Sequence, residues 1–345
     1  MSVSKWDDYL LHQVAQPMDH LGTNSPHFMD RLWFMSYTDD GSMQLMAGLG
    51  VYPNLNIMDG FLLVRMGGIQ RNLRVSRHLQ GPGDRANAVI GPLAFEILEP
   101  QKLWRIALAE NDYGVGCDLE FAGRMPPYLY PRLDFKDQEQ LHYKQPGRCK
   151  GSITFEGRKY PVADMASVRD RSWGFRKPGI ISGFNVLVVA EAHFDDGGAS
   201  LIYFDNLGET FAMRQGALLG DDGSVNEIVQ MRQKIEFETG TRQFRKVELE
   251  LADARGKKHQ LSATAIAPPC FFSGGGYDGR HGLDRGPLNI EGERWDVSRD
   301  ADAAAVFPYY SRIVRFDLDG RPGIGHIEAF FNQDKDWVYK PTWTT

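Results

Sequence analysis

A short segment near the middle of the chain holds an unusual density of side chains that could do chemistry. The nine residues from Val168 to Arg176 include three arginines, one aspartate, one tryptophan and one glycine. In an extended strand successive side chains alternate between faces. The alternation predicts that Asp170, Ser172 and Arg176 share one face, and that the other face carries Arg169, Arg171, Trp173 and Phe175.

Two interpretations of this segment remain open. In the first, Asp170 is a buried acid that transfers a proton, Arg176 anchors a substrate oxygen, and Arg171 and Trp173 shape and wall a pocket. In the second, the segment is a structural clasp at a junction between two halves of the chain. Asp170 would then tie the arginines together, and Trp173 would fill the gap.

Two further strands carry pairs of ionisable residues on one face. His326 and Glu328 alternate with apolar residues near the end of the chain and form an alternative acid/base pair, if they face an enclosed space. Glu191 and His193 share a predicted strand face, and with Tyr203 they are candidate ligand contacts. The plainer interpretation is that both pairs belong to partly hydrated sheet faces.

The common cofactor and metal motifs are absent from the sequence. It contains no phosphate-binding loop, no G-x-S-x-G and no H-E-x-x-H, and its nine histidines form no cluster at metal-ligand spacing. Residues 274–279 match G-x-G-x-x-G formally, but they follow two prolines and run into glycine-broken loop, so they predict a substrate-covering loop and no dinucleotide site. We therefore predict no cofactor and no metal.

The elements that position these residues are predicted to be β-strands. Residues 184–194 alternate in polarity and turn at Asp195-Asp196-Gly197-Gly198 into Leu201 to Phe204, which indicates a hairpin. Short strands with glycine-rich turns about every ten residues are typical of antiparallel barrels. We expect two antiparallel barrel domains, residues 1–178 and 179–345, with a short N-terminal helix that starts after Ser4 and ends before Pro17.

Composition limits the partners. The 345 residues are 42% hydrophobic and 24% charged with a net charge of −6, which predicts a globular protein that binds neither nucleic acid nor an anionic membrane. No apolar stretch is long enough to span a bilayer, and no signal peptide is visible. Three widely spaced cysteines favour a reducing, cytoplasmic location.

The segment Arg169 to Arg176 resembles the R-D-x-S-W-G-x-R segment of bacterial proteins related to AttH and carotenoid 1,2-hydratase, and Gly323 to Glu328 is similar to their closing strand. This resemblance implies two lipocalin-like (calycin) barrels joined near the motif. It also implies relatives that hydrate isoprenoid double bonds or plant phenolics or promote pericyclic cyclisation, without an obligatory metal or nucleotide. Many relatives have histidine where this chain has Arg171, so a proton relay at that position is not expected to carry over.

These observations give two main hypotheses. The first is a cofactor-independent hydratase or lyase that acts on a hydrophobic unsaturated small molecule such as a terpenoid, steroid or phenolic. The second is a non-catalytic carrier of an apolar ligand, whose pocket would be almost wholly apolar, whereas an enzyme would place at least two ionisable side chains at the pocket floor. A scaffold without any pocket is a third hypothesis, and homodimerisation is left open.

Overall fold

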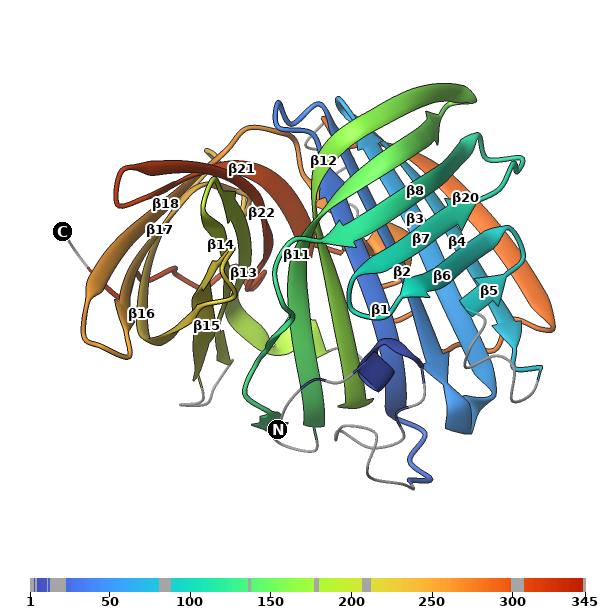
Figure 1. Ribbon diagram of the computed structural model, residues 1–345, viewed down its shortest axis with the longest axis horizontal. Helices are drawn as coiled ribbons and strands as arrows, with labels where there is room; N and C mark the ends of the chain where they lie inside the picture. The colour runs from blue at the N-terminus through green and yellow to red at the C-terminus, as the bar shows by residue number, and fades with distance from the viewer. Residues whose placement is uncertain are drawn as a thin grey trace.

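The protein consists of two β-barrels that lie side by side (Figure 1). The computed structural model describes residues 3, 5–10, 12, 23–80, 88–135, 138–176, 180–206, 212–298 and 307–343. Every strand pair in it is antiparallel. The predicted mainly-β fold of two lipocalin-like barrels is confirmed.

The first sheet has 13 strands and curls into a nearly closed barrel. Its order is β20-β4-β3-β2-β1-β12-β11-β8-β7-β6-β5, and β9 and β10 pair with β11 beside this path. The strands are β1 (Phe28–Tyr37), β2 (Met43–Tyr52), β3 (Ile57–Met66), β4 (Ile69–His78), β5 (Ala88–Ile90), β6 (Leu93–Glu99), β7 (Leu103–Leu108), β8 (Val115–Gly123), β9 (Tyr128–Leu129), β10 (Leu133–Phe135), β11 (Gln138–Phe155), β12 (Arg158–Phe175) and β20 (Leu288–Asp296).

The second sheet has nine strands in the order β18-β17-β16-β15-β14-β13-β22-β21-β19, and pairing of β18 with β21 closes an eight-stranded barrel. The strands are β13 (Phe184–Phe194), β14 (Gly197–Asn206), β15 (Ala212–Gly220), β16 (Val225–Phe237), β17 (Phe244–Asp253), β18 (Lys258–Ala265), β19 (Cys270–Phe271), β21 (Tyr310–Leu318) and β22 (Arg321–Phe331). Short 3₁₀ helices occur at η1 (Lys5–Asp8), η2 (Pro53–Leu55), η4 (Ile180–Gly183) and η5 (Phe272–Gly275).

Some strands are buried on both faces because the two barrels pack against each other. On β1, Leu32 and Phe34 belong to the core of the first barrel, whereas Trp33 belongs to a separate hydrophobic cluster between the barrels. On β13, Val188 points into the second barrel and Leu187 into the same cluster between the barrels. All ten residues of β1 are buried for this reason. Side chains that would face water on an isolated barrel therefore face the other barrel here.

Strand β20 departs from the simple order of the chain. It lies between β19 and β21 in the sequence, yet it pairs with β4 along residues 288–296 and forms an edge of the first sheet. Figure 1 shows this strand in orange beside the blue strand β4. The division at residue 178 stays a prediction, and residues from its C-terminal side contribute to the first sheet.

The predicted N-terminal helix is described only in part. Its described part forms a single 3₁₀ turn over Lys5–Asp8, and residues 13–16, up to its predicted end before Pro17, lie outside the described residues. No described helix has the length and apolar character needed to cross a membrane.

Carboxylates of the N-terminal segment and of β1 supply counter-charges to Arg169 and Arg171 of the central motif. Arg169 Nη1 lies 2.5 Å from Asp8 Oδ1, and Arg171 Nη1 lies 2.8 Å from Asp30 Oδ1. All four side chains are at most 1% exposed. Because Arg169 and Arg171 point into the first barrel, they do not form the clasp between the two halves that the sequence left open. Arg169, for example, lies over the ring of the core residue Trp104.

His12 extends this buried network to Trp173. Its ring nitrogens lie 2.8 Å from Asp7 Oδ1 and 3.2 Å from Asp30 Oδ2. The His12 ring stacks on Trp173, with 3.7 Å between ring centroids. The motif therefore fastens the start of the chain to the first barrel.

The Asp8 carboxylate provides a test of this role. Asp8→Asn leaves the Arg169 guanidinium buried without its counter-charge, and we expect a loss of about 3–5 kcal/mol in the free energy of unfolding. Urea denaturation followed by circular dichroism measures this loss. Asp118→Asn, which breaks the solvent-exposed pair with Arg105, is the matched control and should change stability little. Equal effects of the two substitutions would contradict the structural role of Asp8.

Candidate functional site

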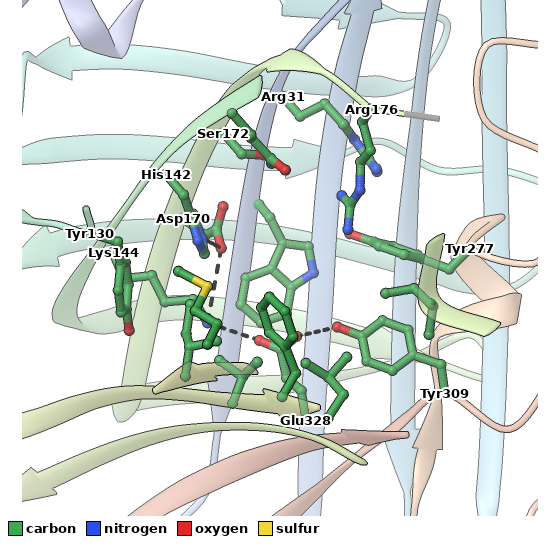
Figure 2. Close-up of a pocket in the computed structure, with 18 of the residues that line it drawn as sticks. Arg31, Tyr130, His142, Lys144, Asp170, Ser172, Arg176, Tyr277, Tyr309 and Glu328 are labelled. Carbon is green, nitrogen blue, oxygen red and sulfur yellow. Dashed lines mark hydrogen bonds and ion pairs between the residues drawn. The ribbon is translucent and has the colours of Figure 1, made fainter. Parts of the chain in front are cut away.

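A cavity of about 130 Å³ lies between the two barrels (Figure 2). Its apolar wall comes mainly from β13, β14 and β15 of the second barrel, and its polar wall from β1, β11 and β12 of the first. The apolar wall consists of Ile181, Phe184, Leu187, Val189, Ile202, Phe204 and Met213. The interiors of both barrels are occupied by their own hydrophobic cores, so this site differs from a ligand pocket inside a barrel.

Alternation along β11 and β12 builds the polar wall. Gln140, His142 and Lys144 occupy alternate positions of β11 and all line the cavity. On the neighbouring strand, Asp170 pairs in register with Lys144, and Ser172 with His142. Asp170 and Ser172 line the cavity as well, as does Arg176 just beyond the end of β12. The faces expected for the central motif are therefore the faces observed.

Lys144 is the centre of a buried charge cluster. Its Nζ lies 2.9 Å from Glu328 Oε1, 3.3 Å from Glu191 Oε1 and 3.9 Å from Asp170 Oδ2, and its side chain is 1% exposed. Burial alone would lower the pKa of Lys144, but the three carboxylates outweigh this effect and raise its pKa. Lys144 is thus a permanent cation that joins a carboxylate of the first barrel to two carboxylates of the second.

Glu328 is held in its ionised form. Burial alone would raise the pKa of Glu328, but the charge of Lys144, aided by hydrogen bonds, holds it well below its usual range. The Tyr309 hydroxyl donates to Glu328 Oε2 at 2.5 Å, and burial together with the charge of Glu328 raises the pKa of Tyr309 well above its usual value. At neutral pH the cavity therefore contains a carboxylate that accepts from a phenol and an ammonium.

His142 and Asp170 form the more accessible pair. His142 Nε2 and Asp170 Oδ2 share a hydrogen bond, and the two side chains are 22% and 16% exposed. The ring of Tyr130 stacks on His142 with 5.2 Å between centroids. A proton shared by an imidazole and a carboxylate at a cavity wall can be passed to a bound molecule.

Glu191 lies behind Lys144 and does not line the cavity. Ser200 Oγ donates to its Oε1 at 2.8 Å, and its Oε2 is buried without a hydrogen-bond partner among the described residues. Burial raises the pKa of Glu191 to about 7, because the attraction of Lys144 offsets only part of the desolvation. Of the three carboxylates around Lys144, Glu191 is therefore one that can hold a proton near neutral pH.

A second cavity of about 310 Å³ adjoins the first. The two cavities have Arg31, Arg176, Ile181 and Tyr277 as common lining residues. Tyr277 belongs to the glycine-rich segment that the sequence predicted as a covering loop. We refer to the first cavity as the inner cavity, the second as the outer cavity, and these four residues as the neck.

The structure brings together only some of the residues predicted from the sequence. Asp170, Arg176 and Glu328 line the inner cavity. His326 is buried beside Glu328, with 3.8 Å between Nε2 and Oε1, and burial lowers its pKa. His193 lies deeper between the barrels, where its ring centroid is 6.4 Å from that of Tyr37. Glu191 contacts Lys144 and does not line the cavity.

Three predicted ligand contacts lie elsewhere. Arg171 and Trp173 point from the opposite face of β12 toward the N-terminal segment. Tyr203 belongs to the core of the second barrel, and its hydroxyl donates to Asp205 at 2.7 Å. We leave these three residues out of the proposed site, because strand alternation turns each side chain away from the cavity.

Sequence reasoning missed Arg31, His142, Lys144, Tyr277 and Tyr309. The signal available for the strand β11 was the alternation of polar residues at 140, 142 and 144, which is also what a solvent-facing strand shows. Distinguishing the two cases requires knowing that the second barrel covers this face.

Two lipocalin-like barrels with a partly charged cavity between them define this chain as a tandem lipocalin-like protein. More specifically, it belongs to a family described as a family of unknown function (DUF8625), whose model matches residues 3–332. No curated protein sequence matches the chain.

Several solved structures share this fold. An AttH-like protein from Nitrosomonas europaea has a TM-score of 0.64 at 12% identity, over 92% of this chain and 99% of that one. Kievitone hydratase from Nectria haematococca has a TM-score of 0.55 at 11% identity, over 87% and 88% of the two chains. CghA has a TM-score of 0.50 at 9% identity, over 94% and 96%. The resemblance noted in the sequence is therefore supported at the level of the fold.

Removing the central cation should make stability depend on pH. In Lys144→Met the carboxylates of Glu328 and Glu191 lose their counter-charge, so their pKa values in the folded state rise. A folded state that holds extra protons loses stability as pH rises, so we expect a larger loss of unfolding free energy at about pH 8 than at about pH 5. Urea denaturation at both pH values measures the difference. Lys150→Met, at an exposed pair with Glu120, is the control. An equal loss at both pH values would contradict the role of Lys144 as the counter-charge of the buried carboxylates.

Glu191 provides an independent pH test. Its pKa is about 7 in the folded state against an ordinary value of 4.5, so the folded protein retains a proton that the unfolded chain loses. Wild-type stability therefore has a component that falls as pH rises through this window. Glu191→Gln lacks this component, so the stability of the variant relative to wild type should rise with pH. Thermal unfolding across the window measures it, with the exposed Glu110→Gln as control, and parallel curves would refute the assignment.

Proposed function

We propose that the protein is a cofactor-independent hydratase, or a related lyase, that acts on a hydrophobic unsaturated small molecule in the inner cavity. The observation that supports this proposal is one cavity in which an apolar wall faces the hydrogen-bonded pair of His142 and Asp170. The apolar wall suits a hydrocarbon portion, and the pair suits proton transfer to it.

Hydration needs only the substrate and water. The proton shared by His142 and Asp170 moves to one carbon of the double bond, a water oxygen bonds to the other carbon, and a proton of that water returns to the pair. One carbon–carbon π bond and one O–H bond are replaced by one C–H and one C–O bond, with no net oxidation or reduction.

Neighbouring groups suit the charge that develops during this reaction. The ionised Glu328 and the face of Trp33 can stabilise positive character on carbon. Trp33 Nε1 is buried without a partner among the described residues, so it can donate to a water or a substrate oxygen. His326 lies against Glu328 and acts in this proposal as a positioning residue.

The carrier hypothesis rests on a different observation, the seven apolar side chains of the second barrel that line the inner cavity. A carrier would retain an apolar ligand without changing it. The ionised Lys144 and Glu328 in the same cavity disfavour a pure carrier, because charged groups without a chemical role add a desolvation cost to apolar binding.

Turnover in isotopically labelled water tests the proposal. A panel of apolar alkenes and enones is incubated with the protein in water enriched in ¹⁸O, and mass spectrometry looks for products that gain one labelled oxygen. Asp170→Asn removes the carboxylate of the proton-transferring pair, so it should lower the rate of the turned-over substrate by about 10²–10⁴-fold.

The matched control is Asp164→Asn, the same substitution at an exposed position of the same strand. It should leave the rate unchanged. Full turnover by Asp170→Asn, or ligand retention without labelled product for every compound in the panel, would refute the proposed hydratase, and the second outcome would favour the carrier.

A further inference from the structure

The neck between the two cavities contains two arginines on neighbouring strands. Arg31 lies on β1, in register with Ser172 of β12, and Arg176 lies just after the end of β12. Both line the inner and the outer cavity. Figure 2 shows their side chains at the edge of the inner cavity beside Tyr277.

Arg31 is a buried cation that forms no ion pair with a described carboxylate. The residue is 6% exposed, its Nη2 lies 3.1 Å from His281 Nε2, and its guanidinium lies 4.9 Å from the centroid of the Tyr277 ring. Among the described residues, no carboxylate lies within ion-pair distance of Arg31. Other buried arginines, such as Arg169 and Arg171, have such a partner.

The acids near the neck contact groups other than the two arginines. Asp170, on the inner side, binds His142, and Asp278, on the outer side, binds Arg280 at 2.8 Å. Asp59 accepts from the backbone of Gly282 at 2.7 Å. Arg176 likewise has no carboxylate within ion-pair distance in the described part of the chain. Neither guanidinium group at the neck therefore has a carboxylate within ion-pair distance among the described residues, although Asp59 and Asp170 attract Arg31 from farther away.

We propose that the neck binds the carboxylate of an amphipathic unsaturated acid, whose apolar portion occupies the inner cavity. Two guanidiniums match the planar, two-oxygen geometry of a carboxylate. The nearby acids Asp170 and Asp278 disfavour a doubly charged group such as a phosphate monoester. The apolar residues on the inner side accept a hydrocarbon chain, and the outer cavity gives the ligand a path to the neck.

This inference rests on the proposed function only where it assumes that the double bond of the bound acid is hydrated. Binding of the carboxylate itself requires no turnover. Isothermal titration calorimetry of the full chain with geranic acid, farnesoic acid and cinnamic acid measures binding directly. The methyl esters and geraniol are the uncharged probes, and geranyl phosphate is the dianionic one. We expect at least one acid to bind about 10- to 100-fold more tightly than its methyl ester.

Variants assign the effect to the neck. Arg31→Gln and Arg176→Gln should each weaken binding of the acid by about 10-fold or more and leave binding of the ester nearly unchanged. Arg31→Lys keeps the charge and should recover part of the loss. Arg294→Gln, at an exposed pair with Glu156, is the control. Because Arg176 forms no ion pair in the described structure, its variant is expected to fold even if a buried change at Arg31 does not.

Each outcome decides the inference. Three results would overturn it: failure of all three acids to bind, esters that bind as tightly as the acids, or variants that weaken binding of acid and ester equally. Tighter binding of geranyl phosphate than of the acids would also overturn it, because the neck would then be a phosphate site. Acid binding without labelled product in ¹⁸O-enriched water would refute the hydratase and leave the carboxylate site standing. Hydration of uncharged substrates alone, without acid binding, would support the hydratase and refute the carboxylate site.

Discussion

The ammonium group of Lys144 is the interaction on which the inter-barrel region depends. It comes from β11 of the first barrel and contacts Glu191 of β13 and Glu328 of β22 in the second. Ionised groups buried between two barrels are tolerated only when opposite charges satisfy one another at short distance. The relative placement of the barrels is therefore linked to the protonation state of the cavity wall, so that the same contacts serve packing and chemistry.

The central motif serves two purposes through one strand. From one face of β12, Arg169, Arg171 and Trp173 hold the N-terminal segment against the first barrel. From the other face, Asp170 and Ser172 line the inner cavity. Because a strand alternates its side chains, fixing one set of residues also fixes the other. The buried ion pairs thus act as a rigid support for the polar wall of the cavity.

The sequence allowed the fold to be predicted because each strand carries its own alternation and its own turn. The hairpin of β13 and β14 and the faces of Asp170, Glu191 and Glu328 follow from period-two patterns alone. The sites of His142 and Lys144 could not be predicted, since a polar face covered by another barrel has the same local pattern as a face in water. Trp173 lies on the face that alternation predicts, but the sequence could not show that this face meets His12 instead of a pocket, because His12 belongs to a segment far away in the sequence.

Strand β20 gives the molecule an order of assembly. During synthesis on the ribosome, residues 28–175 can form most of the first sheet, but the edge of β4 has no partner until residues 288–296 emerge. An open strand edge is a template for pairing with other chains, so the nascent protein carries an aggregation-prone edge while most of the second barrel is being made. The first sheet can therefore be completed only after β13 to β19 have been made, and before β21 and β22 close the second barrel.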